Sequence, residues 1–65
     1  MGEYLARFGN VTVLKATEMA LLCEVEGKQV WIPKSQIHDD SEVYKMGTEG
    51  ELVIPQWLAE EKDLV

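Results

Sequence analysis

Cys23 and His38 are the one cysteine and the one histidine in the chain, and they form its only candidate pair of nucleophile and base. A catalytic thiol needs a partly exposed, electropositive setting that favours the thiolate. Cys23 instead follows Leu22 in an apolar stretch, and the carboxylates of Glu24 and Glu26 would raise its pKa. We therefore expect a buried, inert cysteine and no enzymatic activity.

His38, Asp39 and Asp40 carry the imidazole and carboxylate donors that metal ions use. Adjacent residues rarely converge on one ion without a distant ligand, and the sequence contains no CxxC, HExxH or spaced acidic loop. We expect a turn in which Asp39, Asp40 or Ser41 bonds to nearby backbone, and no metal site. Residues 47–50 (GTEG) place an acid where a phosphate would bind, so no cofactor is expected either.

Residues 30–37, VWIPKSQI, are the most unusual stretch of the chain. An indole beside a proline, followed by a cation and hydrogen-bonding side chains, suits stacking on an extended ligand. In the structural alternative, Val30 and Ile32 point into the core while Trp31, on the opposite face, covers the C-terminal helix. The candidate binding residues share this stretch or lie just before it: Lys28, Trp31, Lys34, Ser35 and Gln36.

Charge is unevenly distributed along the 65 residues. Six Lys and Arg stand against twelve Asp and Glu, for a net charge of −6. Residues 1–37 are balanced, so the second half of the chain carries the whole excess. An acidic surface keeps a small protein soluble, and it also repels nucleic acid or imitates it toward a basic partner.

Short apolar pieces separated by Gly and Asx residues predict β-strands. The expected strands cover residues 11–15, 19–25, 28–32, 42–46 and 51–54. Glu26 and Gly27 are typical of a tight hairpin turn. We expect a single 3₁₀-like turn over 34–37 and a helix over 56–63, with Pro55 in its first turn and Trp57 as its core anchor.

Five short strands and a closing helix predict a mainly β fold, namely a small five-stranded SH3-like or OB-like barrel formed by a single domain over residues 1–65. Residues 1–8 either pack on the barrel or form a frayed arm. No apolar run is long enough to span a bilayer, and a lone cysteine fits a reducing compartment, so we expect a cytoplasmic protein.

Three strings resemble a family of short uncharacterised domains found in bacteriophages, prophages and bacteria. They are KATEMALLC (15–23), VWIPKSQI (30–37) and PQWLAEEKDL (55–64). The resemblance covers most of residues 11–65. It implies a mobile-element accessory module of the bacterial cytoplasm, close to nucleic-acid metabolism. It also implies that five positions are common to the family: Trp31, Pro33, Lys34, Ser35 and Gln36.

We expect a non-enzymatic interaction module that uses the edge formed by residues 31–36 to bind a protein partner or a second copy of itself. The alternative is a single-stranded nucleic-acid-binding module of OB-like shape, which the negative charge of the chain disfavours. A third hypothesis is an acidic inhibitor that imitates nucleic acid and blocks a host enzyme. It requires five acids on one face: Asp39, Asp40, Glu42, Glu49 and Glu51.

Overall fold

The computed structural model describes residues 4–65, which form one antiparallel sheet with the strand order β3-β2-β1-β4. The strands are β1 (Leu5–Ala16), β2 (Ala20–Val25), β3 (Lys28–Pro33) and β4 (Glu49–Pro55). A 3₁₀ turn, η1 (Lys34–Gln36), follows β3, and a short helix, α1 (Gln56–Glu61), follows β4. Within residues 4–65, no helix combines the length and the apolar character that crossing a membrane requires.

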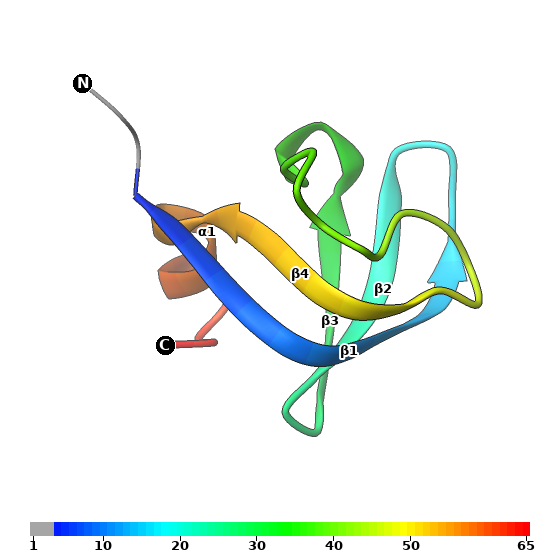
Figure 1. Cartoon of the computed structure of the whole chain (residues 1–65), viewed down its shortest axis with the longest axis horizontal. Coiled ribbons are helices and arrows are strands. Elements are labelled where there is room, and N and C mark those ends of the chain that lie inside the picture. The colour runs from blue at the N-terminus through cyan, green and yellow to red at the C-terminus, as the bar shows by residue number, and fades with distance from the viewer. Residues whose placement is uncertain (1–3) are drawn as a thin grey trace.

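β1 is the long central strand, and it bends so that its two halves serve different neighbours. Its first half pairs with β4 and its second half with β2, and an irregularity interrupts each of the two ladders. In the irregularity between Phe8 and Val11, Asn10 has a positive φ of 58°. The bends curl the sheet, so that β1 and β4 lie in front of β2 and β3 in Figure 1.

β2 and β3 form the hairpin that the sequence predicts. Glu26 and Gly27 have φ values of 52° and 84°, as a type I′ turn requires at its two central residues. The ladder runs without interruption from Val25 opposite Lys28 to Ala20 opposite Pro33. Pro33 is the last residue of the strand, and η1 follows it directly.

One face of the curled sheet packs against α1 and encloses the core. Every second residue of β2, from Leu21 to Val25, is fully buried, as the predicted alternation requires. The rest of this core cluster comes from the other strands, from α1 and from two residues outside these elements, Val43 and Leu64; its members are Ala6, Phe8, Val11, Val13, Ile32, Val43, Leu52, Ile54, Leu58, Ala59 and Leu64.

The expectation of a closed five-stranded barrel is wrong, because residues 42–46 do not form a strand. Val43 reaches the core, but the backbone around it turns instead of pairing along a neighbour. The N–H groups of Tyr44 and Lys45 donate to the hydroxyl of Thr48, at 3.1 and 3.3 Å. A side chain thus takes up backbone donors that a strand would give to a ladder, and the sheet stays open.

The N-terminal segment packs from Leu5 onward and is not a frayed arm, because Leu5 starts β1 opposite Pro55 and Phe8 is buried; residues 1–3 lie outside the described part. The C-terminal end differs from expectation. Pro55 is the extended residue before α1 and not part of its first turn. Trp57 is not a core anchor: its side chain is 52% exposed, and Leu58, Ala59 and Leu64 are buried instead.

Candidate interaction edge

The β4 edge of the sheet is closed by the chain itself. Residues 38–42 run along β4 and take up the backbone groups that face away from β1. Ser41 is the centre of this contact: its hydroxyl accepts from Val53 N at 2.7 Å and donates to Val53 O at 3.0 Å. The hydroxyl therefore does the work of both the acceptor and the donor of a neighbouring strand.

Two further residues complete the closure of β4. His38 N also donates to Val53 O, at 2.8 Å. Glu42 bonds to Glu51 twice, since its N–H donates to Glu51 O at 2.7 Å and its side-chain Oε1 accepts from Glu51 N at 2.8 Å. Gly50 makes room for this carboxylate, because a Cβ at that position would lie 2.5 Å from Glu42 Oε1.

The β3 edge lies at the other side of the sheet and is open. The residues that flank a two-residue hairpin turn, here Val25 and Lys28, exchange hydrogen bonds, and every second pair after them does the same. Gln29 and Trp31 belong to the alternate pairs, so their N–H and C=O groups point away from β2. No hydrogen bond joins these four groups to another part of residues 4–65.

A row of side chains on the outer face of the sheet leads to this open edge. Lys15 pairs with Leu22, and Leu22 pairs with Trp31, so the three side chains share one face. Ile32 is buried and Val30 packs against the core, so Trp31 points away from the core that α1 covers. Val30 and Ile32 face the core as the structural alternative has it, but Trp31 does not cover the helix, and its side chain is 43% exposed.

The other predicted binding residues lie at the two ends of β3. Lys34 and Ser35 are exposed and Gln36 is half-buried in η1, which is held to the turn before β2 by Lys34 N donating to Met19 O at 2.8 Å. Lys28 lies at the opposite end, where its Nζ donates to the backbone oxygen of Asp63 at 2.8 Å. Lys34, Ser35 and Gln36 thus follow the C-terminal end of β3, close in sequence to Trp31, whereas Lys28 lies at the other end of the strand.

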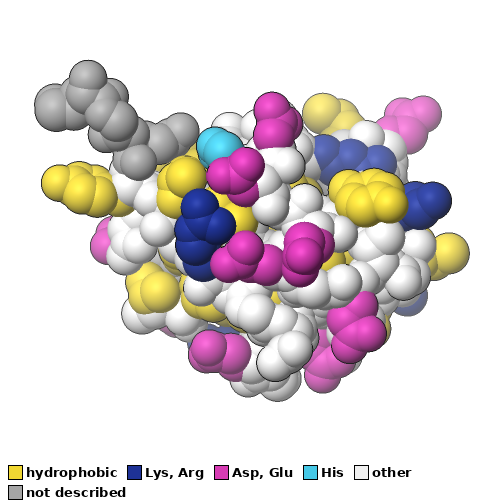
Figure 2. Space-filling view, in the orientation of Figure 1, with side chains coloured by type: hydrophobic (Ala, Val, Ile, Leu, Met, Phe, Trp, Pro, Cys, Tyr) yellow, Lys and Arg dark blue, Asp and Glu magenta, His cyan; other side chains and the backbone are white. Residues whose placement is uncertain are grey.

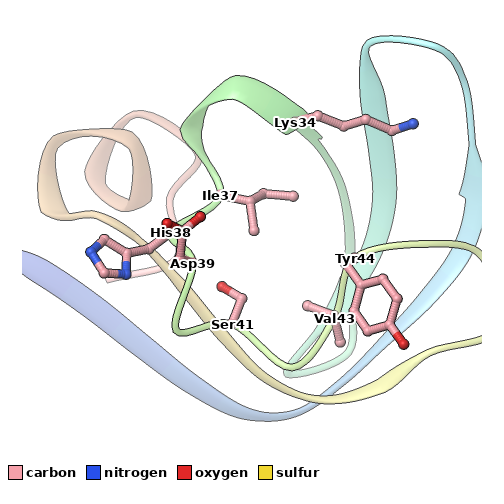
Figure 3. A pocket seen from close by; sticks show the side chains of 7 residues that line it. All are labelled: Lys34, Ile37, His38, Asp39, Ser41, Val43 and Tyr44. Atoms are coloured by element: carbon pink, nitrogen blue, oxygen red, sulfur yellow. The ribbon is translucent and has the colours of Figure 1, made fainter.

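A shallow hollow of about 300 Å³ lies beside η1 (Figure 3). Ile37 and Val43 point toward its middle, and Lys34, His38 and Tyr44 stand around it. The imidazole is already engaged, because His38 Nδ1 accepts from the backbone N–H of Asp40 at 3.1 Å. In the described part of the chain, no group of three or more His, Cys, Asp and Glu side chains is arranged to hold a metal ion.

Cys23 is fully buried, as expected, on the core face of the sheet, opposite the face on which Trp31 sits. Its Sγ lies 3.9 Å from Leu21 O. Burial raises the pKa of this thiol to about 11, because the thiolate would lose its hydration in an apolar core. The carboxylates that the sequence analysis held responsible are not the cause, since desolvation alone accounts for the shift.

Acidic side chains gather around a single arginine on the face that carries the closed edge (Figure 2). The guanidinium of Arg7 lies 3.7 Å from Asp40 and 3.3 Å from Glu51, and the Glu42 side chain bonds to the backbone of the latter residue. Three of the five acids that an imitation of nucleic acid would need are thus close together. Two of these three are paired with a cation of the same chain.

Gln29 is the residue of the open edge that the sequence analysis missed. Its contribution is backbone and not side chain, so residue type gave no sign of it. Counting outward from the Glu26–Gly27 turn would have revealed it, because alternation directs the backbone groups of Gln29 and Trp31 the same way.

Comparison of the chain with protein-family models, curated proteins and solved structures finds no match.

Proposed function

We propose that this domain is a non-enzymatic interaction module whose β3 edge binds an extended segment of protein. The observation that carries the proposal is the contrast between the two edges of one sheet. The chain fills the outward backbone groups of Glu51 and Val53 on β4, and it leaves those of Gln29 and Trp31 on β3 without a partner within residues 4–65.

An added strand is the ligand that fits such an edge. Backbone donors and acceptors at strand spacing are complemented by the backbone of another extended chain, and neighbouring side chains then select its sequence. Trp31 and Leu22 offer an apolar contact beside the edge, while Lys34 in η1 adds a positive charge. We expect the bound segment to carry an apolar side chain over Trp31 and an acid toward Lys34.

A first test is to replace Trp31 and Lys34 together with alanine. The probes are peptides of twelve residues selected from a displayed random library against the intact chain, with affinities measured by isothermal titration calorimetry. We expect the double variant to lose at least about tenfold in affinity, because an exposed Trp at the centre of a contact carries much of its binding energy.

The matched control replaces Trp57 and Lys62, a second exposed Trp with a nearby lysine, which lie in and just after α1. This variant should bind the selected peptides like the unaltered chain. Peptides that bind both double variants equally well would contradict the proposal. Loss of the circular dichroism of the fold in the Trp31 and Lys34 variant would show that Trp31 has a structural role instead.

Single-stranded nucleic acid is a second candidate ligand, favoured by the row of Lys15, Leu22 and Trp31. An exposed indole on a sheet face offers a stacking surface for a base, and a lysine on the same face offers a charge for the phosphate backbone. Fluorescence anisotropy with labelled oligo-dT and oligo-U at low salt tests this candidate. It is excluded if neither oligonucleotide binds at tens of micromolar protein.

A further inference from the structure

We infer that the strand which adds to β3 is β3 of a second copy of this chain, related to the first by a two-fold axis. The inference rests on the proposed function, because it uses the same open edge. A two-fold axis makes the two strands antiparallel and lets one surface serve both copies. The two sheets then join into one continuous sheet of eight strands.

The open groups fix the register of this pairing. When Gln29 of one copy lies opposite Trp31 of the other, the N–H and C=O groups of both residues find partners in each copy. Val30 then lies on the two-fold axis, opposite Val30 of the other copy. Shifting the pairing so that Trp31 faces Trp31 places Gln29 opposite Pro33. Proline has no N–H, so the carbonyl of Gln29 would then lack a donor. The register through Val30 is therefore the favoured one.

Charge supports a second copy in the same register. It brings Glu26 in the hairpin turn of one copy next to Lys34 at the start of η1 in the other, and symmetry repeats the pair. Both residues are exposed. The clustered acids Asp40, Glu42 and Glu51 lie at β4, the opposite edge of the sheet, so the copies do not bring these acids together.

The contact also covers the exposed indole. On the outer face, Trp31 of one copy lies directly beside Gln29 of the other and diagonally across the axis from Trp31 of the other. Side chains in such diagonal positions are about 7–8 Å apart at their Cα atoms, which is within reach of an aromatic ring. The row of Lys15, Leu22 and Trp31 thus continues across the axis instead of ending in solvent.

Cysteine crosslinking tests this register. Residues directly opposite each other in a pair without hydrogen bonds have Cα atoms about 4.5 Å apart, which suits a disulfide. We expect Val30→Cys to form a covalent dimer under mild oxidation. Gln29→Cys is the matched control, because two copies of residue 29 would lie beyond the reach of a disulfide in this register. Cys23 lies opposite Val30 in the β2–β3 ladder and could form a disulfide within one chain, so both crosslinking variants also carry Cys23→Ala and each has a single thiol.

Charge exchange gives a second test with unaltered strands. Sedimentation equilibrium should show that the chain dimerises, and that Glu26→Lys and Lys34→Glu each weaken the dimer about fivefold. The variant that carries both changes should recover the affinity of the unaltered chain, because the pairs are restored with opposite signs. If the double variant lost as much dimer affinity as the two single variants together, the pairing would be contradicted.

Hydrogen exchange covers the case in which Val30→Cys does not fold. In the unaltered chain, the amide protons of Gln29 and Trp31 should exchange at least about tenfold more slowly at millimolar than at micromolar protein. A chain that stays monomeric at millimolar concentration overturns the inference. If selected peptides still bind at Trp31, the proposed function stands and the partner is another protein. If they do not, the dimer and the proposed function both fail.

Discussion

Cys23 shows how burial alone sets the chemistry of a side chain in this domain. The sulfur is fully enclosed, and burial raises the pKa of its thiol from the ordinary value of 9.0 to about 11 in the folded chain. Below pH 9 the thiol is protonated in both the folded and the unfolded chain. Between pH 9 and 11 the unfolded chain ionises first, so the folded state loses stability as the pH rises.

We expect the free energy of unfolding to fall by about 2 to 3 kcal/mol over this interval because of Cys23 alone. Urea unfolding at pH 8, 9, 10 and 11 measures it, with Cys23→Ala as the reference. The alanine variant is less stable at pH 8, but it lacks the titrating thiol, so the difference in unfolding free energy between the two proteins should narrow toward pH 11. Parallel curves would mean that the thiol titrates alike in both states.

The two tryptophans mark the limit of what residue type can predict. Both sit beside apolar neighbours, and residue type predicted a core anchor at Trp57 and left a binding role open for Trp31. The structure leaves both exposed, at 52% and 43%. Which face of a short helix turns inward depends on the sheet that it meets, and here Leu58 and Ala59 fill that space. A single sequence holds no signal for that choice.

The end of α1 is the clearest case of an element shaped by one residue. After Lys62 the chain turns with Asp63 at a φ of 60°, so that Leu64 N donates to Ala59 O at 2.8 Å and Asp63 N to Glu60 O at 3.1 Å. These two bonds form a Schellman motif, and Leu64 returns the chain to the core. Glycine adopts this conformation more readily than aspartate does.

Asp63→Gly should therefore be more stable than Asp63→Ala by about 1 kcal/mol. Both changes remove the same carboxylate, so the comparison isolates the backbone conformation from the charge. Thermal and urea unfolding of the two variants measure the difference. Equal stabilities would show that the turn after Lys62 relaxes freely without its positive φ.

The strands were predictable to different degrees, for a physical reason. The hairpin of β2 and β3 depends on a local turn and on alternation over a few residues, and both are present in the sequence. The failure at residues 42–46 came from Val43, whose apolar side chain reaches the core from a turn. Pairing is decided by where backbone donors go, and the hydroxyl of Thr48 takes up two of them.

The shape of the whole sheet depends on contacts between distant segments. β1 pairs with β4 across about forty residues, and bends in β1 curl the sheet around the core. The sequence predicted a β fold with a C-terminal helix, which is confirmed, but it could not show whether the curl closes. Closure requires a fifth strand, and residues 38–42 instead bond to β4 through scattered backbone and side-chain groups.

Ser41→Ala should weaken the molecule as a whole. It removes both bonds to Val53 and leaves a buried backbone N–H without its partner, which we expect to cost about 1 to 3 kcal/mol. Urea unfolding measures the loss, and Ser35→Ala in the exposed η1 turn is the control, expected within about 0.5 kcal/mol of the unaltered chain. An equally stable Ser41→Ala would show that water replaces the hydroxyl at this edge.

The closed β4 edge also sets how large an assembly of this chain can become. Sheets that are open on both sides add strand after strand and grow into fibrils. Two copies joined through β3 would present only their β4 edges to further copies, and Ser41 and Glu42 already occupy the backbone groups there. Growth by strand addition would then stop at the dimer, because the loop of residues 38–42 would keep a third copy from adding a strand at either end of the joined sheet.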